Sequence, residues 1–310
     1  MSGFMEVLRT VLPVVLMIAI GMLCRRRRLL TREGVNGLKN VVVSITLPAV
    51  LIHAFASTEY TPMDVAVPLM MFVVCVLAWL AGRWMGRLLR MRSRFVPFLT
   101  TGFEAGMLGY ALFHMLYGAE HTAEFARVDL GQVLFVFTLY KVLLGMEGRE
   151  RADVRALLKE MALSPIILAI AAGVLLGATG LYRALVPSGV SALIDACTDF
   201  VSAPTSAIIL LTIGYDLVLD DIPWIETLKV VVLRLAILFL LRTALIALLG
   251  RLWPAADLTR AINVMFILPP PFVLPVFADD ADQRVYVSSA LSVSTLAAIV
   301  AFTAFAALGI

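Results

Sequence analysis

The chain has 310 residues, of which 61% are hydrophobic and 15% are charged, and its net charge is +3. The charged fraction lies well below the roughly 25% that is typical of soluble globular proteins, so the composition excludes a soluble protein and predicts an integral membrane protein. The small net charge says little by itself.

Ten apolar segments follow one another along the chain. A helix that crosses about 30 Å of hydrocarbon needs about 20 mostly apolar residues. Segments of about this length lie at residues 4–23, 41–57, 65–82, 96–117, 128–146, 164–181, 189–217, 227–249, 259–278 and 286–309. The sequence therefore predicts an all-α membrane protein with ten transmembrane helices and no soluble domain.

Clusters of arginine and lysine mark alternate connections between these segments. They follow the first, third and fifth segments, at Arg25 to Arg28, Arg32, Lys39, Arg83, Arg87, Arg90, Arg92, Arg94, Arg149, Arg151, Arg155 and Lys159. Because basic loops face the cytoplasm, we expect a multi-pass protein of the cell membrane with both termini outside. Since the first cluster follows its apolar segment, we expect that segment to stay as an anchor. Such a cluster at a membrane edge is typical of an orientation signal, and we expect no nucleic-acid partner.

Motifs of catalysis and metal binding do not appear. The three cysteines are not spaced as CxxC, and the three histidines do not form a zinc-protease pattern. No glycine-rich phosphate loop is present. We therefore expect no enzyme, no metal site and no cofactor, apart from a coupling Na⁺ or H⁺ if transport is driven by an ion.

Two of the predicted helices carry residues that interrupt a helix inside the membrane. They are Gly102, Glu104, Gly106 and Gly109 in the fourth segment and Pro269, Pro270 and Pro271 in the ninth. Three successive prolines remove three backbone donors, whereas the glycines could also form a GxxxG packing face. Interruptions at corresponding places in the two halves indicate the binding site of a transporter.

A weak internal repeat supports this two-halved arrangement. Pro13 is followed eight residues later by Gly21, and Pro165 is followed eight residues later by Gly173. Five helices per copy is an odd number, so the second copy would enter the membrane inverted. We expect a first five-helix repeat over residues 1–150 and a second, inverted repeat over residues 151–310.

Four stretches carry a resemblance to a known family. They are LPVVLMIAIGMLCRRRRLLTREGVNGLKNVVVSITLPAVL, SPIILAIAAGVLLG, APTSAIILLTIGYDL and LPPPFVLPVFADD, and together they resemble the auxin efflux carrier family, which includes bacterial permeases. The resemblance implies a scaffold domain from helices 1, 2, 6 and 7 and a transport domain from helices 3 to 5 and 8 to 10. It also implies that broken helices 4 and 9 cross at the site and that the protein forms a homodimer.

The sequence departs from the family at positions that bear on the substrate. The family's broken-helix proline falls on Ala111 and its binding-site asparagine on Glu104, while Val273 stands where many bacterial members have asparagine. An ionised Glu104 would repel a carboxylate, so the resemblance supports a transporter more strongly than it supports an organic anion as the substrate.

Several polar residues inside apolar segments are further candidates. A carboxylate at membrane depth costs on the order of 3 kcal/mol, so Glu104 is either a coupling site for a proton or cation or a paired structural acid. Asp195 and Asp199 share a helix face, and Asp199, the deeper acid, is either functional or paired near the Pro204 kink.

The basic candidates and one polar pair complete the predicted site. Arg242 and Lys141 are the candidate counter-charges, although Lys141 can snorkel, and Arg234 is interpreted as another snorkelling side chain. Asp129 and Gln132 line an outer vestibule, or Asp129 faces the dipole at the start of its helix.

The sequence thus predicts a secondary transporter that moves a small solute, an organic acid or a related metabolite, by alternating access. Its partners would be this solute and membrane lipid. The alternatives are a sodium-coupled permease resembling the bile-acid symporters and a membrane receptor that does not transport.

Overall fold

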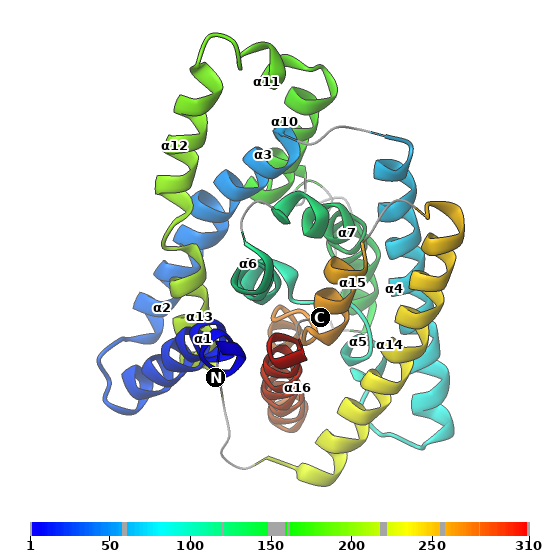
Figure 1. Cartoon of the computed structure of the whole chain (residues 1–310). Coiled ribbons are helices and arrows are strands. Elements are labelled where there is room, and N and C mark those ends of the chain that lie inside the picture. Colours follow the sequence, from blue (N-terminus) through cyan, green and yellow to red (C-terminus); the bar gives the residue numbers. More distant parts are fainter. Residues whose placement is uncertain are drawn as a thin grey trace. The chain divides into compact units, whose positions relative to one another are not determined.

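The computed structural model describes residues 2–57, 61–118, 121–147, 159, 162–217, 222–254, 258–278 and 280–308. Regular structure within these ranges is all helical, without any strand (Figure 1). The helices up to residue 147 are α1 (Ser2–Arg26), α2 (Arg32–Val41), η1 (Val42–Thr46), α3 (Leu47–Ala56), α4 (Met63–Leu88), α5 (Val96–Leu99), η2 (Ala105–Gly109), α6 (Tyr110–Tyr117), α7 (Thr122–Phe135), η4 (Val136–Tyr140) and α8 (Lys141–Glu147). Those that follow are α10 (Pro165–Ala178), α11 (Leu181–Ala184), α12 (Val190–Ser202), α13 (Thr205–Asp216), α14 (Trp224–Leu252), α15 (Thr259–Ile267), η5 (Leu274–Phe277) and α16 (Ala281–Leu308).

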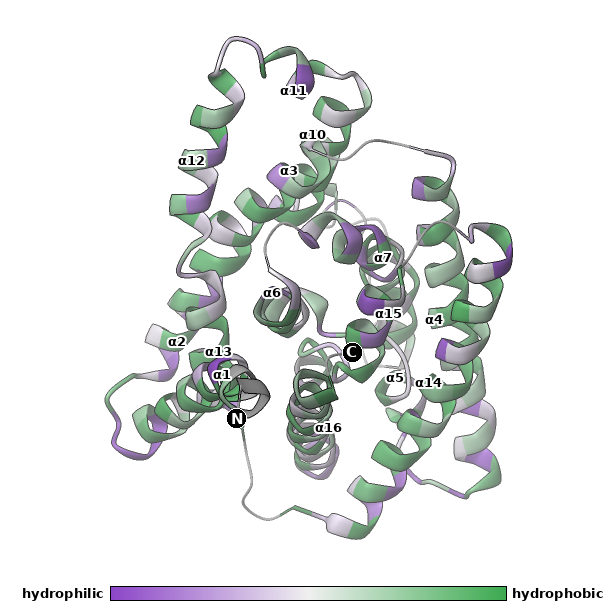
Figure 2. Cartoon of the chain, viewed as in Figure 1, coloured by the Kyte–Doolittle hydropathy of each residue, from purple (hydrophilic) through white to green (hydrophobic). Residues whose placement is uncertain are grey.

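Among the described residues, seven helices are long and apolar enough to cross a membrane. They are Leu8–Arg26, Arg32–Ala56, Met63–Leu88, Thr122–Met146, Val190–Asp216, Trp224–Leu252 and Ala281–Leu308. Two of them, α4 and α14, are hydrophobic along most of their length (Figure 2). The chain is therefore a multi-pass membrane protein. The three other predicted segments are shorter, because 96–117 and 259–278 are interrupted and α10 has 14 residues; the count of ten stays a prediction.

The first two long helices extend further than hydropathy alone predicts. Arg25 and Arg26 form the last turn of α1, and Arg32 and Lys39 lie within α2, not in a loop. The hydroxyl of Thr31 accepts a hydrogen bond from the Gly34 amide at 3.1 Å and starts α2, which continues through η1 and α3. Charged residues are good helix formers, so charge alone does not end a helix.

The chain divides into two compact units, each of which contains residues from both halves of the sequence. Unit 1 comprises residues 1–64, 106–126 and 160–217, and unit 2 comprises residues 65–105, 127–159 and 218–310. Two assignments stay predictions. They are the repeats over residues 1–150 and 151–310 and the division of the helices into a scaffold domain and a transport domain.

In unit 1, glycines let helix backbones touch. A Cβ atom added at Gly21 of α1 would lie 2.1 Å from the carbonyl oxygen of Leu211 in α13, and one at Gly173 of α10 would lie 2.8 Å from that of Ile52 in α3. The two helix pairs α1 with α13 and α10 with α3 make the most extensive packing of this unit (Figure 1). Any larger residue at these glycines would push the backbones apart.

The end of α13 binds the basic residues of α1 and α2. The carboxylate of Asp216 pairs with Arg32 at 2.5 Å and with Lys39, and Arg25 donates a hydrogen bond of 2.9 Å to the carbonyl of Leu217. Cations stabilise the negative C-terminal end of a helix. These residues therefore act as internal partners in unit 1 as well as charges at a membrane edge.

In unit 2, α4 packs closely against α7 and against the segment that follows α5. A Cβ atom at Gly131 of α7 would lie 2.0 Å from the carbonyl oxygen of Pro68 in α4, and one at Gly82 would lie 1.8 Å from Thr100 Oγ1. Thr101 Oγ1 donates a hydrogen bond of 2.6 Å to the carbonyl of Cys75. Helix α4 thus supports the residues at which the fourth segment is interrupted.

Candidate functional site

Both interruptions predicted from the sequence correspond to irregular backbone in unit 2. Residues 100–104 separate α5 from η2, and residues 268–273 separate α15 from η5. Gly102 has a φ of +64°, in the left-handed region that favours glycine. Pro269, Pro270 and Pro271 supply no backbone donor.

The glycine string is shorter than the sequence indicates. Gly106 lies within η2, and Gly109 has a helical φ of −59° at the start of α6, so neither interrupts a helix. A Cβ atom at Gly106 would meet Leu47 Cδ2 only at the ordinary distance of 3.5 Å. Gly102 is the glycine of the string that has a left-handed φ, and the interruption therefore lies before Gly106.

Glu104 connects the two irregular segments. Its backbone amide donates a hydrogen bond of 2.9 Å to the carbonyl of Pro269, and its Oε2 atom accepts one of 2.6 Å from the amide of Phe272. A Cβ atom added at Gly102 would lie 2.9 Å from Pro271 Cγ. The two segments are thus in direct contact, with a half-buried carboxylate between them.

Arg234 of α14 binds carbonyl oxygens from both segments. Its guanidinium donates to Leu99 at 3.0 Å, Thr101 at 3.2 Å, Gly102 at 2.8 Å and Leu268 at 2.9 Å. Carbonyls at the end of a helix lack an intrahelical donor, and these lie at and just beyond the ends of α5 and α15. One arginine, which has five N–H donors, satisfies four of them.

The prediction that Arg234 snorkels is wrong. The residue is 2% exposed, and its guanidinium lies 5.3 Å from the ring centroid of Phe103. It follows the start of α14 by ten residues, about 15 Å along the axis, and faces the interior of unit 2. The sequence signal for a buried role is an arginine deep in an apolar helix. The carbonyls freed by the two interruptions are its hydrogen-bond partners.

Asp129 and Gln132 also adjoin the first irregular segment. Gln132 Nε2 donates to Asp129 Oδ1 at 3.0 Å, and Gln132 Oε1 accepts from the amide of Phe103 at 3.4 Å. Both side chains are at most 4% exposed. Because α7 begins at Thr122, Asp129 lies two turns inside the helix, and its interpretation as a helix-start acid is wrong.

The basic candidates have neutral partners in unit 2. Arg242 Nε donates a hydrogen bond of 2.8 Å to Oδ1 of Asn263, a residue of α15 that is 2% exposed. The ammonium of Lys141 lies 4.7 Å from the ring centroid of Phe137. Arg242 therefore joins α14 to α15, the helix that precedes the prolines.

Asp199 lies in unit 1, where it lines a polar cavity. The cavity has a volume of about 480 Å³, and its walls come from α3, α6 and α7 together with α12, α13 and their junction. Its lining residues are Leu47, Val50, His53, Tyr110, His114, Thr122, Thr198, Asp199, Ser202, Ala203, Thr205 and Ser206. Hydroxyls, two imidazoles and one carboxylate make this cavity suitable for a small polar molecule.

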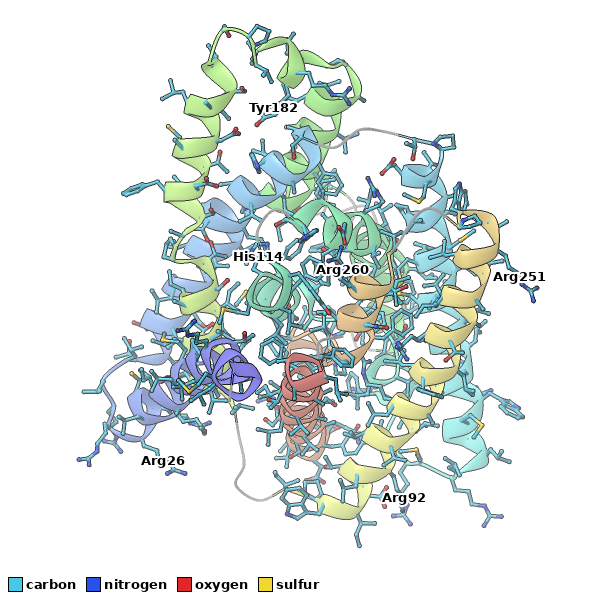
Figure 3. The ribbon with its side chains drawn as sticks, in the orientation of Figure 1. Arg26, Arg92, His114, Tyr182, Arg251 and Arg260 are labelled. Carbon is cyan, nitrogen blue, oxygen red and sulfur yellow. The ribbon has the colours of Figure 1, made fainter. Side chains whose placement is uncertain are left out.

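Three contacts order the polar groups around this cavity. His114 Nε2 lies 2.7 Å from Thr122 Oγ1, and His53 Nδ1 lies 3.1 Å from Asp195 Oδ1. Tyr182 lies on the connection between α10 and α12 (Figure 3). Its hydroxyl donates to the same Asp195 oxygen. Burial and this hydrogen bond raise the pKa of Tyr182 to about 12, so the phenol stays neutral at physiological pH.

The predicted site residues therefore fall into two groups. Unit 2 brings together Glu104, the prolines, Asp129 and Gln132, whereas Gly106, Gly109 and Asp199 belong to unit 1. Among the described residues, no cluster of three or more histidine, cysteine, aspartate or glutamate side chains could hold a metal ion.

A comparison with known families places the first half of the chain. A family model described as membrane transport protein matches residues 6–156. No curated protein matches the chain. The family is one of transporters and not of enzymes. Residues 6–156 of the chain are thus similar to the auxin efflux carrier family of membrane transport proteins, the family that the sequence motifs resemble.

Proposed function

We propose that the protein is a secondary transporter that moves a small solute by alternating access, with its site at residues 100–104 and 268–272. The observation that carries this proposal is the contact between two interrupted apolar segments, joined by Glu104 and by Arg234. Inside a membrane, irregular backbone is tolerated only against protein or a water-filled cavity. Interrupted helices of this kind form the binding sites of many transporters.

The packing of unit 1 supports a pair of inverted repeats. Gly21 and Gly173, which hold the same place in the proposed repeats, are both close-contact glycines. Gly21 joins predicted helix 1 to helix 7, and Gly173 joins helix 6 to helix 2. Under a repeat of five these two pairs are equivalent, which favours ten helices in two inverted sets. The basic connections favour both termini outside the cytoplasm.

Glu104 is our candidate for ion coupling. It is half-buried, and its carboxylate accepts a hydrogen bond from the backbone amide of Phe272. Protonation or binding of Na⁺ would weaken this bond and alter the contact between the two segments. The solute would be an organic acid or a related metabolite, and an anion would have to approach Glu104 with its charge neutralised.

The cavity at Asp199 is a second candidate site for solute or ion. Thr205 Oγ1 is buried there without a hydrogen-bond partner among the described residues, so an occupant could satisfy it. This cavity is compatible with transport and also with a receptor that binds without transporting.

Counterflow in proteoliposomes tests the proposed function. Vesicles preloaded with one unlabelled organic acid should accumulate the labelled acid transiently, at several pH values and with or without Na⁺. Vesicles with protein that binds the acid but shows no counterflow would support the receptor. An absolute requirement for Na⁺ would favour the permease that resembles the bile-acid symporters.

The oligomeric state and the location of the protein are two further expectations. We propose that the protein acts as a homodimer in the cell membrane, as the family resemblance implies. Cross-linking in native membranes, followed by separation of monomer from dimer, would test the dimer.

A further inference from the structure

A second cavity lies in unit 2, away from the interrupted segments. It has a volume of about 840 Å³ and is formed by the residues that follow α4 and by the beginnings of α14 and α16. Its lining residues are Leu89, Arg90, Arg92, Ser93, Pro223, Glu226, Lys229, Asp282, Gln283, Val285 and Tyr286. The cavity is thus at the edge of the predicted membrane region, where one apolar helix ends and two begin.

Two arginines at this cavity are available to bind an anion. Arg90 and Arg92 are exposed, and neither guanidinium makes a hydrogen bond or ion pair with the described residues. Lys229 is different, because it pairs with Glu226 at 2.8 Å. A guanidinium group can donate two parallel hydrogen bonds to the oxygens of one phosphate. Two arginines without an ion-pair partner at one cavity therefore favour a phosphate-bearing ligand.

Neither carboxylate of the cavity forms an ion pair with these arginines among the described residues. Glu226 lies in the first turn of α14 and Asp282 in the first turn of α16, where acids stabilise the positive end of a helix. Glu226 is also neutralised by Lys229. Arg90 and Arg92 therefore make the charge positive on the side of the cavity that is formed by the residues following α4.

Leu89 of the cavity and three apolar residues that adjoin lining residues in the sequence are exposed. The exposed fractions are 63% for Leu88, 52% for Leu89, 54% for Trp224 and 72% for Ile225. A soluble anion would make no apolar contact with this surface, whereas the acyl chains and glycerol of a lipid would cover it. Tryptophan is also enriched at the level of the headgroups.

We propose that this cavity binds the headgroup of an anionic phospholipid, with Arg90 and Arg92 on the phosphate and the acyl chains along Leu88, Trp224 and Ile225. Basic pockets between transmembrane helices bind such headgroups on the cytoplasmic side. The positive-inside pattern assigns this edge to the cytoplasmic leaflet, where the lipid would hold α4 beside α14 and α16. This site is independent of the solute site.

Lipid titration of the purified protein in a neutral detergent tests the proposal. Phosphatidylglycerol should raise the temperature of unfolding, and phosphatidylcholine should not. The double variant Arg90→Gln/Arg92→Gln should bind phosphatidylglycerol about 30-fold more weakly, because each basic residue contributes to binding at an anionic surface. The control is Arg251→Gln at the opposite end of α14, which should bind as the parent protein does (Figure 3).

Three outcomes would overturn the proposal. Equal stabilisation by the two lipids would show that binding does not depend on the charge of the headgroup. Equal loss of binding in Arg251→Gln would show general charge attraction without a defined cavity. Saturation of the effect by inorganic phosphate alone, with no further gain from lipid, would identify a site for a soluble anion. Because the assay measures lipid binding and no transport, its result does not depend on the proposed solute site.

Discussion

Replacement of Arg234 by methionine should destabilise unit 2 strongly. Methionine has a similar length but no donor, so the carbonyls of Leu99, Thr101, Gly102 and Leu268 would lose their bonds to the guanidinium. A buried carbonyl left without a donor costs about 1 kcal/mol or more. The desolvation of the guanidinium is avoided in the variant, so we expect a net loss of about 3 to 4 kcal/mol.

Heating of the detergent-solubilised protein, followed by size-exclusion chromatography, measures this loss. The temperature at which half of the protein remains monodisperse should fall by about 10 °C, since 1 kcal/mol corresponds to roughly 2–4 °C in chains of this order of size. Arg234→Lys should lose about half as much, because an ammonium has three donors and cannot reach all four carbonyls.

The matched control is Arg251→Met in the last turn of the same helix, where the side chain is exposed. This control should keep the parent's stability, since surface substitutions usually change it little. If Arg234→Met unfolded within about 2 °C of the parent, the carbonyls would have other partners and the central role of Arg234 would be refuted.

Four further predictions concern the interrupted segments, the unit 1 cavity and the orientation of the chain. Gly102→Ala should lower stability by about 1 to 2 kcal/mol and impair transport, because the φ of +64° suits glycine and an added Cβ would meet Pro271. The control Gly250→Ala has open space around its Cβ and should be neutral or stabilising in the same thermal assay. Glu104→Gln keeps an acceptor for the Phe272 amide, so it should remain folded yet lose ion-driven accumulation; full accumulation under an imposed pH or Na⁺ gradient would exclude the coupling role. Asp199→Asn should weaken binding of polar solutes at the unit 1 cavity in a thermal-shift screen, and unchanged binding would assign the cavity no ligand. Tags at both termini should be labelled from outside intact cells, and labelling only after permeabilisation would contradict the orientation.

Hydropathy predicts the long helices well but misjudges where they end. The count of apolar residues locates α4, α14 and α16 to within six residues at each end. It misses α2, whose charged residues continue the helical backbone after the Thr31 cap and pair with Asp216, a residue 177 positions away from Lys39. Local composition carries no information about such distant partners.

The candidate site shows the same limit. Glycine and proline identify the interrupted segments, since both act on the backbone at their own position. The role of Arg234 depends on carbonyls that lie up to 135 positions away along the chain, and no property of its own helix reports them. The hydrogen bond from the amide of Phe103 to Gln132 likewise joins residues 29 positions apart, which meet only after folding.

The four bonds of Arg234 also bear on how the protein is made. An arginine at the centre of an inserting helix costs about 2.5–3.5 kcal/mol, which the leucine, isoleucine, valine and phenylalanine side chains of α14 must offset at about 0.3–0.6 kcal/mol each. Leu99, Thr101 and Gly102 are synthesised before α14, but Leu268 follows Arg234 by 34 residues. The helix therefore leaves the translocon with its charge only partly matched, and shortening its apolar run should impair biosynthesis before it impairs the finished protein.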